Sequence, residues 1–364
     1  MGTLLVGTRK GLFVLEGAGE AWEFVGHHFA GDPVSQVLAD ARDGNWYAAL
    51  NLGHFGIKLR RSGDRGRTWT EVASPAFPAK PAAGPWADDP TPWSVELIWA
   101  LAAGGADEPG VLWAGCLPAG LFRSADRGAT WQLCQSLWHD ARRRDWTGGG
   151  YDQAGIHTVL VDPRDARHLT LGISCGGVWQ TRDGGASWEL TGRGMRADFM
   201  PPERAEDPNI QDPHCIAQCL ADPDVLWMQH HGGIYRSVDA GRHWLPIAAA
   251  GPSTFGFAVA ADPGNPGRAW FVPAQADACR IPVGGRMVVT RTDDGGASFQ
   301  VYGEGLPQRH AYHLVYRHAL AVGGDGDTLA MASTTGGLWV STNAGRSWAC
   351  LSRDLPPVAA VRFA

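Results

Sequence analysis

The chain has 364 residues, of which 44% are hydrophobic and 19% are charged, and its formal net charge is -6. This composition excludes an intrinsically disordered chain, which has few hydrophobic residues and a high net charge. It also argues against a nucleic acid as partner, because a nucleic-acid-binding domain needs a clustered basic face.

Cysteines and apolar stretches narrow the class of protein further. The 7 cysteines are an odd number without a Cys-x-x-Cys pair, unlike a disulfide framework or a zinc knuckle. The sequence has no apolar run of roughly 18 residues, and its N-terminal stretch has the pattern of strands rather than of a leader peptide. We therefore expect a cytoplasmic protein without a membrane partner. The densest basic run, residues 142–144, is interpreted as a solvated loop, with contact to an anion as the alternative.

In chain order, the first apolar runs are LLVGT, GLFVLE and WEFVG, at residues 4–8, 11–16 and 22–26. Their lengths and the turns between them predict three strands. Similar groups of apolar runs recur later in the chain, each with one further run before the three. The third and fourth runs of each later group flank a Ser-x-Asp-x-Gly-x-Thr-Trp motif. The motif or a close variant occurs at residues 62–69, 124–131, 181–188, 237–244, 292–299 and 341–348.

The copies of the motif differ at single positions. His243 stands in place of the hydroxyl residue, Phe299 in place of the Trp and Asn343 in place of the Asp. The segment GLFVLEGAGEAW aligns without gaps to GLFRSADRGATW and keeps only Gly19 and Trp22 of the motif. With this eroded copy the motif recurs at spacings of about 47 to 62 residues, which indicates seven similar structural units.

Each complete unit has the pattern of four strands, with the motif between the third and the fourth. Four-stranded antiparallel sheets repeated around an axis form a β-propeller, so we predict an all-β, seven-bladed β-propeller. The C-terminal segment VAAVRFA, residues 358–364, has the pattern of a first strand without a unit, and the first unit lacks that strand. We expect the last strand to complete the first blade and residues 1–364 to form one domain.

The chemistry of the motif suits a hairpin turn. Its Asp carboxylate can accept hydrogen bonds from backbone N–H groups, its Gly tolerates a positive φ, and its Trp can pack between sheets. Asn343 can form the same kind of turn bond as Asp. We therefore interpret the motif aspartates as structural residues and look for chemistry elsewhere.

The repeated motif resembles the Asp box, or bacterial neuraminidase repeat, of sialidases, xyloglucan-degrading glycosidases, sortilin-type receptors and a photosystem II assembly factor. The chain as a whole resembles bacterial glycosyl-hydrolase-like and sialidase-like repeat proteins. The resemblance implies the propeller fold, but its members include enzymes, receptors and assembly factors, so it implies no single activity. Sialidases carry Arg-Ile-Pro ahead of the first Asp box, whereas here Arg280, Ile281 and Pro282 lie in the sixth unit. The sialidase catalytic site is therefore not carried over.

The longest connections between the predicted strands fall opposite the motif turns. Long loops gathered at one end of a rigid scaffold are the usual place for binding and catalysis, so we expect the functional face there. These connections cover residues 74–93, 137–155, 191–213 and 275–286.

Histidines recur near this expected face. If the chain binds a divalent metal ion, we expect His157, His214 and His230 to be its ligands, because neutral imidazoles from different blades can converge on an ion. Adjacent strand residues point to opposite sides, so His230 and His231 should not both bind it. Ordinary hydrogen-bonded imidazoles are the alternative. The residues expected to contact substrate are His54, Tyr151, Arg196 and His231.

Carboxylates accompany the histidines. Asp152 and Asp212 each precede a predicted metal ligand, where a carboxylate can orient an imidazole or act as a general base. Two carboxylates across a pocket can also serve as acid and base in glycoside cleavage, whereas a single Asp can simply cap a loop. The candidate catalytic residues are Glu96, Asp152, Asp198 and Asp212.

Two functions from different classes remain open. We favour an enzyme that acts on a small polar or sugar-like substrate in an axial pocket, by hydrolysis or metal-assisted elimination. The alternative is a non-catalytic propeller that binds a protein or another ligand, which predicts a broad apolar face and no bound ion. The sequence leaves the oligomeric state open.

Overall fold

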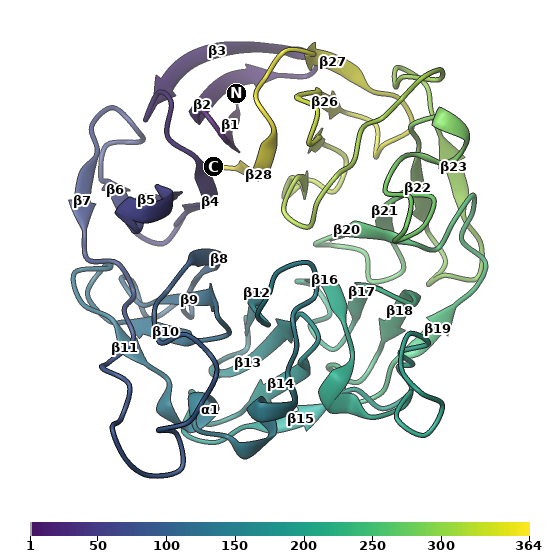
Figure 1. Cartoon of the computed structure of the whole chain (residues 1–364). Coiled ribbons are helices and arrows are strands. Elements are labelled where there is room, and N and C mark those ends of the chain that lie inside the picture. Colours follow the sequence, from purple (N-terminus) through teal and green to yellow (C-terminus); the bar gives the residue numbers. More distant parts are fainter. Residues whose placement is uncertain (1) are drawn as a thin grey trace. The chain divides into compact units, whose positions relative to one another are not determined.

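The computed structural model describes residues 2–364, whose strands are labelled in Figure 1. The chain divides into two compact units. The first unit consists of the chain up to Val34, Arg193–Pro202 and His214–Ala364. The second consists of Ser35–Gly192 and Glu203–Pro213. The prediction of a single domain over the whole chain stays a prediction. Within residues 2–364 we find no helix with the length and apolar character that a membrane span requires.

The first unit is built from four-stranded antiparallel sheets. In sheet order, their strands are β28 (Val358–Phe363), β1 (Gly2–Thr8), β2 (Gly11–Ala18) and β3 (Ala21–His28); β16 (Pro213–Gln218), β17 (Leu226–His230), β18 (Gly233–Ser237) and β19 (Leu245–Ile247); β20 (Gly256–Ala261), β21 (Ala269–Pro273), β22 (Val289–Thr292) and β23 (Gln300–Tyr302); and β24 (Leu320–Val322), β25 (Leu329–Ala332), β26 (Leu338–Ser341) and β27 (Ala349–Ser352). A short 3-10 helix, η4 (Val283–Gly285), lies between β21 and β22.

The second unit has sheets of the same kind. Their strands are β4 (Val34–Ala39), β5 (Trp46–Asn51), β6 (Ile57–Ser62) and β7 (Thr70–Val72); β8 (Leu97–Ala103), β9 (Leu112–Leu117), β10 (Leu121–Ser124) and β11 (Gln132–Leu133); and β12 (Ile156–Asp162), β13 (Asp165–Ile173), β14 (Gly177–Thr181) and β15 (Glu189–Thr191). The connections carry α1 (Gln135–Trp138) and the 3-10 helices η1 (Gly53–Phe55), η2 (Ala141–Asp145) and η3 (Pro208–Ile210). Seven successive four-stranded sheets confirm the predicted fold class, a seven-bladed β-propeller.

The two ends of the chain complete one sheet, as the sequence predicted. β28 pairs antiparallel with β1, with Leu4 opposite Phe363 and Val6 opposite Val361. Val6 and Val361 are both fully buried and pack in one apolar cluster. Because these ladder hydrogen bonds join residues far apart in sequence, the sheet can form only when the chain's two ends meet.

The motif turns confirm the structural interpretation of their aspartates. In the copy at 124–131, the Asp126 carboxylate accepts hydrogen bonds from the Thr130 backbone N–H at 2.8 Å and the Thr130 hydroxyl at 2.6 Å. The Ser124 hydroxyl donates to Asp126 Oδ1 at 2.8 Å and accepts from the Gly128 N–H at 2.9 Å. These bonds satisfy turn N–H groups that the strand ladder leaves unpaired.

The variant copies keep the same bonds with other atoms. His243 Nδ1 donates to the Asp239 carboxylate at 2.6 Å, in the role of the missing hydroxyl. Asn343 Oδ1 accepts from the Ser347 N–H at 3.0 Å, and its Nδ2 donates to Ser347 Oγ at 2.8 Å. In the eroded copy, Trp22 Nε1 still donates to the Gly19 carbonyl at 3.0 Å. These hydrogen bonds support the treatment of all these segments as copies of one motif.

Replacing Asp126 tests how much the turn depends on its carboxylate. Asp126→Ala should lower the free energy of unfolding by about 1 kcal/mol, the usual loss when a side chain stops accepting from backbone N–H groups at a chain reversal. Asp126→Asn should lose clearly less, because Asn343 already serves in the equivalent turn. Urea unfolding measures both variants, and equal losses for Ala and Asn would contradict this account of the turn.

Acid should weaken the same turns. Hydrogen bonds from the Thr68 hydroxyl and N–H hold the pKa of Asp64 at about 2, and the Ser298 hydroxyl and N–H do the same for Asp294. A carboxyl whose pKa is lower in the folded than in the unfolded chain stabilises the fold above the unfolded value near 4, and that stability is lost as the pH falls toward 2.

We therefore expect the melting temperature to fall between pH 4 and pH 2, and the difference between wild type and Asp64→Asn to shrink over that range. Thermal unfolding followed by circular dichroism measures both quantities. A difference between the two proteins that stays constant from pH 5 to pH 2 would show that Asp64 does not contribute in this way.

Candidate functional site

In the first unit, histidines and aromatic rings gather where the first strands begin and the second strands end. His214 is the second residue of β16 and is buried, and its Nδ1 donates to the Gly256 carbonyl at the start of β20 at 2.7 Å. This bond places the proton on Nδ1, so Nε2 carries the lone pair that a metal ligand or general base needs.

The rings around His214 form a continuous group, which we call the histidine–aromatic cluster: His214, His231, Phe199, Phe255 and Phe257. The His214 and Phe257 rings stack with centroids 4.5 Å apart and planes 11° apart. His231, just after β17, lies edge-on to His214 at 5.4 Å and to Phe199 at 5.0 Å. The cluster therefore brings two predicted site histidines together inside one unit.

His214 and His231 also have the separation of possible metal ligands, since a ring nitrogen of each lies within 4.8 Å of the other. Two nitrogen ligands of one tetrahedral zinc ion, each at about 2.1 Å from it, lie roughly 3 to 4 Å apart. A small side-chain adjustment would bring this pair into that range. In the sequence, Asp212 precedes His214 by two residues.

The other two predicted metal ligands have different surroundings. His230 is buried at the end of β17, where its Nδ1 accepts from the Gly232 N–H at 2.9 Å and its ring packs edge-on to Tyr235. His157 lies in the second unit, hydrogen-bonded to the Thr158 hydroxyl at 2.9 Å. His231, rather than His230, is the imidazole that lies beside His214.

In the second unit, the long connection before β12 lies directly on a buried carboxylate. Asp212 is 3% exposed, and its Oδ1 accepts from the Cys175 N–H at 3.2 Å. A Cβ on Gly149 would lie only 2.8 Å from Ser174 Oγ and 3.2 Å from Asp212 Oδ1. Only glycine lets the backbone come this close, so the sequence Gly-Gly-Gly at 148–150 is what allows the loop to cover Asp212.

The same loop exposes an aromatic ring and a second carboxylate. Tyr151 is 50% exposed and rests edge-on against the buried ring of Trp99, with centroids 5.1 Å apart. Asp152 follows it and is exposed. We call Tyr151, Asp152, Ser174, Cys175 and Asp212 the loop carboxylate cluster. An exposed ring held by a buried one next to a carboxylate is a suitable platform for a sugar ring.

The remaining predicted residues belong to neither of the two clusters. Glu96 and His54 are exposed, and the His54 ring packs on Phe55 at 3.9 Å. Arg196 Nε lies 2.6 Å from Asp198 Oδ1, so these two exposed residues form an ion pair in the first unit. The roles proposed for these residues stay predictions.

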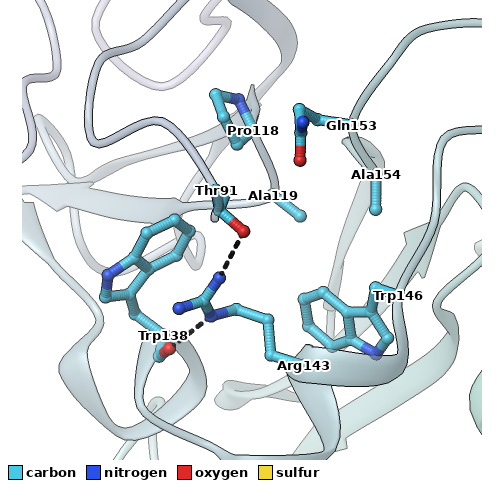
Figure 2. A pocket seen from close by; sticks show the side chains of 8 residues that line it. All are labelled: Thr91, Pro118, Ala119, Trp138, Arg143, Trp146, Gln153 and Ala154. Atoms are coloured by element: carbon cyan, nitrogen blue, oxygen red, sulfur yellow. Dashed lines mark hydrogen bonds between the residues drawn. The ribbon is translucent and has the colours of Figure 1, made fainter. Parts of the chain in front are cut away.

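The basic run at 142–144 is not simply a solvated loop, because Arg143 is buried (Figure 2). Its Nη2 lies 2.5 Å from Asp89 Oδ2, its Nη1 donates to the Thr91 hydroxyl at 3.1 Å, and its Nε donates to the Trp138 carbonyl at 2.6 Å. The hollow beside it has a volume of about 220 Å³, below the usual range for small-molecule sites. We interpret Arg143 as a structural residue that holds the 74–93 and 137–155 connections together.

Sequence reasoning missed the partners that shape both clusters. In the sequence, Phe255 and Phe257 have the pattern of ordinary strand residues. Nothing in the pattern around Ser174 and Cys175 indicated that their turn faces Asp212. One signal was present in the glycine run at 148–150, since consecutive glycines in a long connection indicate close backbone approach.

Comparison with known proteins places this geometry in context. No family model matches the chain. The oligoxyloglucan-reducing end-specific xyloglucanase of Emericella nidulans is 27% identical over 165 residues, which are 40% of this chain and 18% of that protein. The crystal structure of the GH74 xyloglucanase from Xanthomonas campestris aligns at a TM-score of 0.65 with 18% identity, covering 96% of this chain and 52% of that one. The structure of YCF48 bound to D1 peptide aligns at a TM-score of 0.52 with 12% identity, covering 87% of this chain and 82% of that one.

The chain thus spans 18% of the curated xyloglucanase and 52% of the structurally similar one. At such low identity the structural matches establish the fold. The protein is accordingly a seven-bladed β-propeller that has xyloglucanases among its relatives.

Proposed function

We propose that the protein is a glycoside hydrolase that acts on a xyloglucan-like or related β-glucan oligosaccharide, at the loop carboxylate cluster. The observation that carries this proposal is that the glycine-rich loop with the exposed Asp152 covers Asp212, a carboxylate from another connection that is only 3% exposed. Carboxylates in unlike surroundings suit the two different roles of glycoside cleavage. The xyloglucanase relatives support the substrate class.

In this proposal the sugar ring stacks on Tyr151, and the residues divide the proton transfers between them. Asp152, which solvent and leaving group can reach, donates a proton to the glycosidic oxygen as that bond breaks. Asp212, held by the Cys175 N–H, serves at the anomeric carbon, as the nucleophile or as the base that takes a proton from the attacking water. Water supplies the hydroxyl group of one product and the hydrogen of the other.

Release of reducing ends from a panel of xyloglucan and β-glucan oligosaccharides tests the proposal. Asp212→Asn should lower kcat by at least about 100-fold, because removal of a catalytic carboxylate removes an interaction needed in the transition state. Asp207→Asn is the matched control, since Asp207 caps η3 by accepting from the Asn209 N–H, a role that Asn can keep. Folded wild-type protein that cleaves none of the oligosaccharides, or equal activity in Asp212→Asn and Asp207→Asn, would refute it.

We also propose that His214 and His231 bind a divalent metal ion, with zinc preferred by the two imidazoles. An ion held there would act as a Lewis acid toward a sugar oxygen or a bound water. The chain's own contribution is to orient the imidazoles: the Gly256 carbonyl fixes the tautomer of His214, and Phe199 packs against His231.

Elemental analysis of protein purified without a polyhistidine tag tests the metal proposal. His214→Ala and His231→Ala should each abolish stoichiometric zinc, whereas His230→Ala should keep it, because His230 accepts from the Gly232 N–H instead. Loss of metal in His230→Ala but not in His231→Ala would favour the ligand set predicted from sequence and overturn the structural one. Absence of metal in wild type after growth with added zinc would overturn both.

A non-catalytic binding function is a second candidate, because a propeller of similar fold binds a peptide. The structure of YCF48 bound to D1 peptide aligns over 87% of this chain. The exposed rings Phe199 and Tyr312, at 45% and 60% exposure, could contact such a partner. Absence of hydrolysis in the assay above would leave this function as the better supported one.

A further inference from the structure

The sheet that joins the two ends of the chain has an unusually long outer strand, β3. β3 has 8 residues, whereas the fourth strands of the other sheets, β7, β11, β15, β19, β23 and β27, have 2 to 4. Within residues 2–364, β3 pairs with β2 on one side and with no strand on the other (Figure 1). Propellers usually keep such edges short, because the unpaired N–H and C=O groups of an edge strand can pair with another chain. We call Ala21–His28 the β3 edge.

The β3 edge also presents two successive apolar side chains to solvent. Leu15 lies opposite Phe24 and Val14 lies opposite Gly26, so Val25 forms a bulge between the two pairs. Phe24 is 46% exposed and Val25 is 53% exposed. A bulge can turn an edge strand away from other chains, but this one leaves two apolar groups together on the outside of the sheet. Their burial against an apolar partner surface would be favourable.

One end of the β3 edge is acidic. Glu16 and Glu23 lie directly opposite each other in the β2–β3 ladder, and Glu20 lies in the turn that joins the two strands. All three are exposed, and no ion pair within residues 2–364 includes any of them. Like charges directly opposite each other destabilise a pair of strands, so a nearby cation would be favourable here.

The other end of the same strands is basic. Arg9 and Lys10 form the exposed turn between β1 and β2. The Lys10 carbonyl oxygen lies 2.9 Å from Nε2 of His27 on β3, so this turn lies beside the last residues of the β3 edge. The edge therefore runs from an acidic end at the β2–β3 turn to a basic end at the β1–β2 turn.

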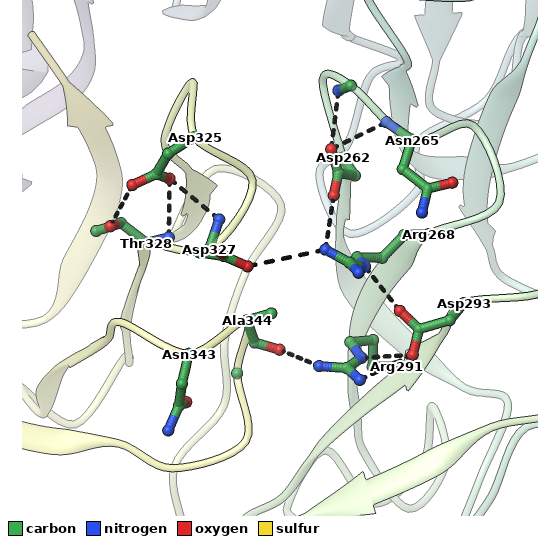
Figure 3. Close-up of polar contacts among 12 residues, drawn as sticks. Asp262, Asn265, Arg268, Arg291, Asp293, Asp325, Asp327, Thr328, Asn343 and Ala344 are labelled. Atoms are coloured by element: carbon green, nitrogen blue, oxygen red, sulfur yellow. Dashed lines mark hydrogen bonds and ion pairs between the residues drawn. The ribbon is translucent and has the colours of Figure 1, made fainter.

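Elsewhere the first unit places opposite charges in direct contact, as Figure 3 shows. Arg268 lies between Asp262 and Asp293, at N–O distances of 3.2 and 2.7 Å. Arg291 also pairs with Asp293, at 2.8 Å. The opposed glutamates of β2 and β3 have no such arginine, so the imbalance of charge is a local feature of this edge.

We propose that a second copy of this chain covers the β3 edge, with the two β3 strands antiparallel across a two-fold axis near Phe24 and Val25. In that arrangement the backbone groups of each edge pair with those of the other. The exposed apolar side chains of the two copies meet at the axis. The acidic end of each copy lies beside the basic end of the other, which supplies the missing cations. This proposal does not rest on the hydrolase activity, because β3 lies outside the loop carboxylate cluster.

Sedimentation equilibrium at low ionic strength, over a series of protein concentrations, tests the proposal. Wild type should form dimers, and Val25→Lys should weaken the dimer at least tenfold, because it places two like charges near the axis. Val301→Lys is the matched control, because Val301 is 51% exposed on the short outer strand β23. It should dimerise like wild type.

Glu23→Lys separates dimerisation from the stability of the fold. Within one copy it replaces the repulsion of Glu16 by attraction, so the melting temperature of the monomer should rise. In the dimer it sets a lysine beside Arg9 and Lys10 of the other copy. Because the change acts at two equivalent contacts, it should weaken the dimer at least tenfold. Adding Lys10→Glu to Glu23→Lys should restore most of the lost affinity.

Three results overturn the proposal. Wild type that stays monomeric at every concentration would show that the edge does not join two copies, and so would equal dimer affinity in Val25→Lys and Val301→Lys. A dimer that Glu23→Lys leaves unchanged would refute the antiparallel arrangement. Hydrogen exchange gives the third: if the β3 amides become protected only when a different protein is added, another chain occupies this edge.

Dilution of the wild-type protein should expose the same amides again, because a dimer dissociates as the protomer concentration falls.

Discussion

Six of the sheets depend on one recurring interaction, the acceptance of turn N–H groups by a side chain in the hairpin between the third and fourth strands. Asp126 and Ser124 between them accept from the backbone of Thr130 and Gly128. The interaction tolerates exchange of its parts, as His243 and Asn343 show. Because it uses short, local bonds, the same turn can be repeated along the chain while the connections at the other end of each sheet vary.

The fold could be predicted from the sequence because the repeated turns are local, whereas the connections between them vary. A local turn leaves a sequence pattern, so even the eroded copy was recognisable from Gly19 and Trp22, whose hydrogen bond survives. The pairing of β28 with β1 was also predictable, because a missing first strand at one end and a surplus strand at the other match each other. Hydrophobic alternation and spacing were sufficient for both inferences.

The site was harder to predict, because its contacts join residues distant in sequence. His231 is adjacent to His230, and only the end of β17 at His230 decides which imidazole meets His214. Asp212 was expected to be catalytic, yet its burial depends on the close approach of Gly149, a backbone property. Arg143 belonged to a basic run that looked solvated, and its burial follows from Asp89, more than 50 residues away in sequence. Side-chain partners of this kind leave no periodic signal.

The two clusters differ in their chemistry, and this difference relates to what the protein can bind. The loop carboxylate cluster offers acid and base groups beside an exposed ring, whereas the histidine–aromatic cluster offers nitrogen ligands. The xyloglucanase relatives favour a sugar as the ligand, although this chain covers only part of their length. The central claim is that a sugar binds on the loop that covers Asp212.

A crystal structure of the protein grown with a xyloglucan oligosaccharide tests that claim most directly. Our account predicts a sugar ring stacked on Tyr151, with a glycosidic oxygen within hydrogen-bond distance of Asp152. An oligosaccharide bound instead at the motif turns, or a loop of residues 147–152 that makes no contact with the sugar, would contradict it.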